Sequence, residues 1–277
     1  MAVSLAALAP VATLLVLLEV AAGTVAAAYL VDWTGRVGRG FVGTTALICA
    51  AVMGVDILIG ANVPSDTTLV HGALPAQPLS GLVHWCVWFA VSLLGFALFC
   101  WIGTDAARRV VGALTIAVGG AALGMAAAAF GPAVGGGSVA ALAFVPAALV
   151  GGSALAGMLL GHWYLVAPSL SFRPLRQVIR LVFATVGVQL VVLVAVIALQ
   201  PSQVRSALLV SEYALPFWLL IVGAGIVFTV AVALLTRHFA RMRANQPATA
   251  MLYVLIISVV MGVVPAHMLF FVTGVPV

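Results

Sequence analysis

The chain has 277 residues, of which 65% are apolar and only 6% are charged. A soluble domain carries about a quarter charged residues, so this composition excludes a water-soluble globular protein and predicts one that is embedded in a membrane. The net charge of +5 does not indicate nucleic acid as a partner, because the basic residues are scattered in short segments between apolar runs.

Eight apolar runs follow one another along the chain, each about 20 residues long or longer, which is enough for a helix to cross a hydrocarbon core of roughly 30 Å. They cover residues 5–31, 40–62, 79–103, 109–131, 138–166, 175–200, 207–236 and 248–274. The sequence therefore predicts an all-α bundle of eight transmembrane helices that forms a single integral membrane domain over residues 1–277. It has no room for a soluble catalytic domain.

The orientation of the bundle is predicted from its arginines. All eleven basic residues are arginine, and ten of them lie in or next to the loops that join spans 1 to 2, 3 to 4, 5 to 6 and 7 to 8, whereas Arg205 lies at the other end. Short loops rich in Lys or Arg stay in the cytoplasm. We therefore expect both termini on the outer face and a multi-pass location in the cytoplasmic (inner) membrane of a bacterium. The longest connection, residues 62–80, then lies outside as a lid or a docking loop.

Five ionisable side chains in the apolar runs stand out as candidates: Glu19, Asp56, His84, Glu212 and His267. Placing an ionisable group in hydrocarbon costs at least a few kcal/mol, so such a residue is a functional candidate by default. From the helical rise of 1.5 Å per residue, four of the five converge on one layer about 5 to 8 Å beneath the outer surface. Glu19 is expected deeper, near the middle of the membrane.

Aromatic residues accompany this layer. Trp88 lies one helical turn from His84, and Tyr213 is next to Glu212. A quinone needs hydrogen-bond partners for its oxygens, apolar walls for its ring and titratable groups that lead protons to water. The sequence thus predicts a quinone site in which His84 and His267 contact the quinone oxygens. Three carboxylates are assigned to proton transfer: Asp56 and Glu212 toward the outside, and Glu19 inward.

A second group lies at the cytoplasmic end of the fifth run, where His162 and Tyr164 are followed by Arg173. An aromatic and arginine pocket at the interface suits a quinone or a lipid headgroup. The alternative interpretation is an aromatic belt followed by an arginine-rich cytoplasmic loop.

The cysteines and the histidines give different indications about metal and haem binding. The three cysteines, Cys49, Cys86 and Cys100, lack CxxC or paired spacing, so no metal site is predicted from them. A transmembrane b-type haem needs two histidines at similar depth on facing helices. His84 and His267 meet the depth condition, which leaves room for one haem b near the outer face.

These features predict a quinone-reactive membrane anchor subunit of a respiratory electron-transfer complex, with menaquinone or ubiquinone as cofactor. By its number of spans the chain resembles the quinone-handling membrane subunits of the polysulfide-reductase and nitrite-reductase anchor type. The expected partners are membrane lipids and other redox subunits, including an iron-sulfur or cytochrome protein. Any enzymatic role would then be that of an oxidoreductase subunit. The alternative is a proton-coupled transporter of a small molecule or ion that uses the buried acids, and a third is a membrane scaffold without chemistry.

Overall fold

The computed structural model describes residues 5–33, 37–63, 68–69, 72–73, 76–167, 170–199, 201–209 and 211–276. Within these ranges, eight helical segments are long and apolar enough to cross a membrane. Seven of them are single helices: α1 (Leu5–Asp32), α2 (Arg39–Ala61), α3 (Ala76–Ile102), α4 (Asp105–Phe130), α5 (Gly137–Val166), α6 (Arg173–Leu199) and α10 (Asn245–Thr273). The predicted all-α bundle of eight spans is confirmed.

The seventh span is composite. It begins with α8 (Ala214–Pro216), continues as the π-helical segment η3 (Phe217–Phe228) and ends as α9 (Thr229–Arg241). The prediction that this span starts at residue 207 is wrong. Residues 201–209 instead form a separate turn, made of α7 (Pro201–Val204) and η2 (Arg205–Leu209). The break falls at Ser211 and Glu212, two polar residues that the predicted apolar run included.

The connections between the spans carry only short elements. Residues 68–69 (β1) pair antiparallel with residues 72–73 (β2), with Thr68 opposite Ala73. A 3-10 turn, η1 (Gly131–Ala133), leads from α4 into α5. Residues 64–67, 70–71 and 74–75 of the predicted lid or docking loop lie outside the described residues, and the role of the loop stays a prediction.

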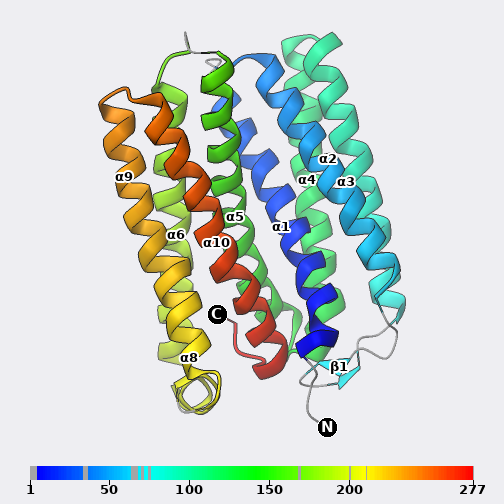
Figure 1. The fold of residues 1–277 in the computed structure, drawn as a ribbon. Helices are drawn as coiled ribbons and strands as arrows, with labels where there is room; N and C mark the ends of the chain where they lie inside the picture. Colours follow the sequence, from blue (N-terminus) through cyan, green and yellow to red (C-terminus); the bar gives the residue numbers. More distant parts are fainter. Residues whose placement is uncertain are drawn as a thin grey trace.

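Three helices form the centre of the bundle. In the most apolar stretch of α1, 72% of the residues are buried, as are 67% in α5 and 56% in α10, against at most 44% in the other five spans. Figure 1 shows α1, α5 and α10 running through the middle, with α2, α3 and α4 on one side and α6 and α9 on the other. A polar group on a central helix is therefore shielded from lipid by the surrounding helices.

Glycines let two pairs of helical segments pack closely, α1 with α5 and η3 with α10. A Cβ atom on Gly23 of α1 would lie 1.8 Å from the carbonyl oxygen of Ala148, and one on Gly152 of α5 would lie 2.0 Å from the carbonyl carbon of Gly23. Gly225 of η3 and Gly262 of α10 meet in the same way, with a Cβ on Gly262 falling 2.4 Å from the Cα of Gly225. Small residues at helix contacts are the usual means of close packing in membranes.

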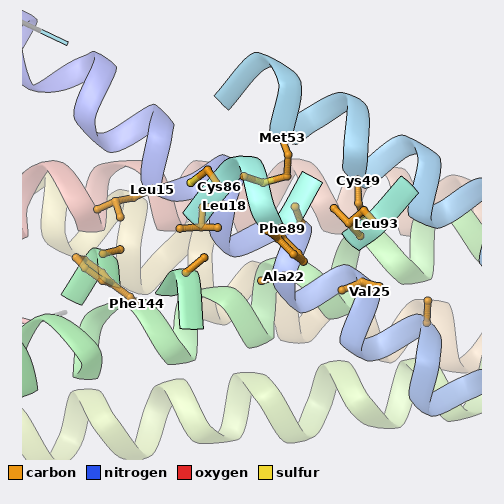
Figure 2. Close-up of a cluster of buried hydrophobic side chains, with 14 of the residues drawn as sticks. Leu15, Leu18, Ala22, Val25, Cys49, Met53, Cys86, Phe89, Leu93 and Phe144 are labelled. Atoms are coloured by element: carbon orange, nitrogen blue, oxygen red, sulfur yellow. The ribbon is translucent and has the colours of Figure 1, made fainter. Parts of the chain in front are cut away.

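The core between α1, α2 and α3 is apolar and well filled. Figure 2 shows Leu18 and Ala22 of α1 together with Met53 of α2 and with Cys86 and Phe89 of α3. All five side chains are buried members of one cluster. The cysteines of this core are free and buried, in line with a packing role.

The start of α1 and the end of α10 lie at the same end of the bundle (Figure 1). The loops that carry most of the arginines lie at the opposite end. There, Arg108 of α4 forms an ion pair with Asp32 of α1, and both side chains are almost completely buried. Arg39 of α2 pairs with the exposed Asp105 at 2.7 Å. These pairs join the arginine-rich ends of the first, second and fourth spans.

Candidate functional site

A carboxylate and an imidazole meet in the centre of the bundle. The Oε2 atom of Glu19 on α1 lies 2.7 Å from the Nε2 atom of His267 on α10, a hydrogen bond between residues 248 positions apart in the chain. Glu19 is completely buried and His267 is 1% exposed. An ionisable pair at this depth has no water to solvate it, so its members depend on each other.

The helix α5 closes the site on a third side. The ring of Phe144 stands edge-on to the His267 ring, with centroids 5.6 Å apart. The Gly23 and Gly152 contact, one helical turn beyond Glu19, holds α5 close to α1. Two polar atoms of the pair, Oε1 of Glu19 and Nδ1 of His267, are buried without a hydrogen-bond partner among the described residues. The site therefore has one donor or acceptor position left on each side chain.

The three helices that surround this pair each contain a proline: Pro10 in α1, Pro146 in α5 and Pro265 in α10. Proline cannot donate the helical hydrogen bond to the carbonyl four residues earlier. Pro265 thereby frees the carbonyl of Met261, and it stands two residues before His267. Pro146 stands two residues after Phe144. Both helices continue through their prolines, and one backbone hydrogen bond of each helix is missing close to the pair.

The electrostatics of the pair favour a single shared proton. With one proton, the site is neutral overall, whether that proton lies on the carboxylate or makes the imidazole cationic. With none it carries one negative charge, and with two it carries one positive charge. An uncompensated charge in a low-dielectric interior is strongly unfavourable. A change in the proton count of this site therefore requires a compensating charge nearby.

The predicted layer of four groups is not formed. His267 is buried beside Glu19, so the expectation that Glu19 lies deeper than His267 is wrong. His84 of α3 and Glu212 are exposed, and Asp56 of α2 is buried. The helix α3 packs against α2 and α4, whereas α10 packs against α5, α9 and η3. These side chains face in different directions around the bundle, so a similar height along the helices does not bring them together.

Because His84 and His267 face different parts of the bundle, the structure does not bring them together as two ligands of one haem iron. His84 has its own partner: its Nδ1 atom donates a hydrogen bond to the carbonyl oxygen of Ser80 at 2.7 Å. The role of Nδ1 as donor is fixed because a carbonyl can only accept. In the neutral ring, Nε2 is then free to accept a hydrogen bond.

His84 lies on an open groove of about 550 Å³ on the outer face of α3 and α4. Trp88, which is 64% exposed, lines this groove, together with Trp85 and Val91 of α3 and Val118 of α4. The predicted stripe of His84 and Trp88 on one helix face is therefore present, and it faces outward from the bundle. Its walls are aromatic and aliphatic, and His84 is the titratable side chain that lines it.

Asp56 and Glu212 lie in separate surroundings. Asp56 is 1% exposed and lies beside the thiol of Cys86, which is a weak donor. Its oxygens have no other partner in the described part of the chain. Glu212 precedes α8 and is exposed beside the half-buried Tyr213. Glu212 and Tyr213 thus belong to the turn before the seventh span and contribute nothing to the central pair.

The three residues that were predicted to form a cytoplasmic pocket have different surroundings. The Tyr164 side chain is buried, and its hydroxyl donates to the carbonyl oxygen of Ser171, which ties the end of α5 to the loop before α6. His162 is exposed, with its Nδ1 atom 3.3 Å from the hydroxyl of Tyr253. Arg173 is exposed on α6. Tyr164 therefore has a structural contact, while His162 and Arg173 face outward.

Two polar features escaped the sequence analysis. Asp32 looked like an interfacial residue because it ends the first apolar run, yet it is 2% exposed and pairs with Arg108. Gln189 of α6 has a buried side-chain oxygen without a partner in the described residues. The only sequence signal for the first was an acid and an arginine at the same predicted end of two spans. That signal indicates that Asp32 and Arg108 lie at a similar height, but it does not show that they contact each other.

Comparison of the chain with models of protein families, with curated proteins and with solved structures finds no match. What can be concluded about function therefore comes from the residues and their geometry: a multi-pass membrane bundle with a buried carboxylate and imidazole pair at its centre.

Proposed function

We propose that the chain is a proton-coupled membrane transporter in which Glu19 and His267 carry the proton. The observation that carries this proposal is the 2.7 Å contact of the two side chains, both buried, each with one unpartnered polar atom. The prolines beside the pair and the π-helical turns of η3 against α10 add support, since proline removes a helical hydrogen bond and π-helical segments are frequent at functional sites.

The need for charge balance gives a mechanism of coupling. When the site loses its proton it becomes anionic, and a cationic solute near the free oxygen of Glu19 would restore neutrality. When the site gains a second proton it becomes cationic, and an anionic solute near Nδ1 of His267 would do the same. The first case exchanges a cation for a proton, and the second moves an anion together with a proton. In both cases the transport step is electroneutral at the site.

The proposal includes the orientation of the bundle in the membrane. Ten of the eleven arginines fall in alternate loops, so by the positive-inside rule the arginine-rich end lies in the cytoplasm and both termini lie outside. In a bacterium this places the protein in the cytoplasmic membrane, where a proton gradient is available to drive transport.

Proton movement in proteoliposomes tests the proposal. The full chain is reconstituted with a trapped pH-sensitive dye, and a pH gradient is imposed. Panels of monovalent cations, inorganic anions, amino acids and organic cations are then added one class at a time. We expect at least one class to release or consume protons above the rate of protein-free vesicles. Glu19→Gln, which preserves size and a hydrogen bond to His267, is expected to abolish that movement.

The matched control is Glu212→Gln, which removes the other glutamate of the chain from an exposed turn. It should leave proton movement unchanged. Solute-driven proton movement that persists in Glu19→Gln, or its absence with every class in the wild type, would contradict the proposal.

A second function is favoured by the groove at His84, namely a quinone-reactive anchor subunit that exchanges electrons with a partner redox protein. An open, aromatic-walled groove facing outward from the bundle suits lateral entry of menaquinone or ubiquinone from the bilayer. The free Nε2 atom of His84 can accept a hydrogen bond from the hydroxyl group of a quinol, the reduced form of the quinone. This proposal needs a partner subunit to supply or receive the electrons, such as an iron-sulfur or cytochrome protein.

Quinone retention distinguishes this second function from the first. We expect the purified wild type to carry menaquinone or ubiquinone, and Trp88→Ala to lose most of it because the groove loses one aromatic wall. Trp218→Ala serves as control, since Trp218 is similarly exposed at 55% but lies on η3. Equal quinone content in the two variants, measured by chromatography of lipid extracts, would exclude a quinone site in the groove.

A further inference from the structure

Two rows of arginines face each other at the arginine-rich end of the bundle. Arg173, Arg176 and Arg180 lie three and four residues apart on α6, so they share one helix face. Arg237 and Arg241 lie four residues apart on α9. The two helices pack against each other. They run in opposite directions (Figure 1), and Arg180 of α6 lines the same groove as Arg237 of α9.

No side chain in the described part of the chain supplies a counter-charge to these arginines. None of the five forms an ion pair or hydrogen bond with another described side chain. The carboxylates of this end, Asp32 and Asp105, form ion pairs with Arg108 and Arg39 instead. Five like charges held close together repel one another. An anion from outside the chain would relieve that repulsion.

The space between the rows is a groove of about 340 Å³, lined by Arg176, Arg180, Arg237 and Arg241 and by two apolar side chains, Ile179 and Phe183. A second groove of about 310 Å³ continues past Arg173 along α6. The apolar surface extends toward the middle of the membrane, where Leu234 of α9 and Val191 of α6 are 51% and 67% exposed. The groove thus offers cationic groups at one level and apolar surface below them.

We propose that this groove binds an anionic phospholipid whose headgroup carries two phosphates. Guanidinium groups recognise phosphate through paired hydrogen bonds, and four of them around one groove match two phosphate groups. Basic pockets between membrane helices on the cytoplasmic side are suited to such headgroups. A lipid is the occupant because the apolar floor below the arginines gives its acyl chains a surface, which a free phosphate would not use.

Native mass spectrometry of the full chain in detergent tests this proposal. The probes are cardiolipin with two phosphates, phosphatidylglycerol with one, phosphatidylcholine with no net charge, and inorganic pyrophosphate as a soluble diphosphate. We expect one cardiolipin to bind each chain most tightly. Arg237→Gln/Arg241→Gln should weaken it tenfold or more, because each arginine contributes to attraction of an anionic headgroup.

The control variant is Arg109→Gln/Arg243→Gln, which removes the same charge from the same end of the bundle but outside the groove. It should keep cardiolipin affinity within about twofold of the wild type, since these residues would act only through the general surface charge. Equal weakening in both variants would overturn the site. Pyrophosphate that binds as tightly as cardiolipin and displaces it would overturn the assignment to a lipid.

Discussion

Replacement of Glu19 by leucine is expected to lower the free energy of unfolding by about 3 kcal/mol. The loss of a hydrogen-bond partner from a buried polar group costs about 1–3 kcal/mol, and the loss of a partner from a buried ion pair costs about 3–5 kcal/mol. Leucine fills most of the volume of the glutamate, so little of the effect comes from a cavity. Unfolding of the detergent-solubilised chain in a titration with SDS measures the change.

The second half of this experiment adds His267→Leu to the Glu19→Leu chain. Replacement of both members of a buried polar pair by apolar groups of similar size is often close to neutral. The double variant should therefore be more stable than Glu19→Leu alone, which gives a favourable coupling energy between the two sites. Additive destabilisation, with no coupling, would mean that the two side chains do not interact in the folded protein.

Replacement of Asp32 by alanine is the other substitution for which we expect a large loss of stability, about 3 kcal/mol. It leaves the Arg108 guanidinium buried without its main counter-charge, and the Nε atom of Arg108 already lacks a partner. The cost lies at the lower end of the range for broken buried ion pairs, because Asp105 remains 3.3 Å from Arg108. The same SDS titration measures it.

Asp105→Ala is the matched control for Asp32→Ala. The side chain of Asp105 is 65% exposed and pairs with the exposed Arg39, so water replaces the contact when it is lost. We expect little change in stability. A larger loss from Asp105→Ala than from Asp32→Ala would show that the pair between Asp32 and Arg108 does not hold these helix ends together.

Much of the fold could be predicted from the sequence because a membrane imposes a simple rule. Each span must be long, apolar and helical, so the first six spans and the last were predicted to within about four residues. The seventh span was predicted too long at its start. Its apolar run includes Leu208 and Leu209, yet the helix is interrupted before Ala214.

The site could be predicted only in part. The rise per residue gives the height of a side chain along its helix, but not the direction in which it points. The side chain of Glu19 is completely buried, which its height along α1 alone does not determine. His84 lies on a helix whose outer face is exposed, and this depends on how α3 packs between α2 and α4. No pattern along the chain connected Glu19 with His267, because their contact depends on the arrangement of three central helices.

The protonation of Glu19 in the folded protein is the most direct test of the central claim. The chain contains only two glutamates, so in the Glu212→Gln variant a carbon-13 label on glutamate reports on Glu19 alone. Infrared spectra of this labelled variant in liposomes follow its carboxyl band as pH changes. We predict a band that converts between protonated and ionised forms and that shifts when His267 is replaced by leucine but not when His84 is. A band that is unaffected by both pH and the residue at position 267 would contradict the account.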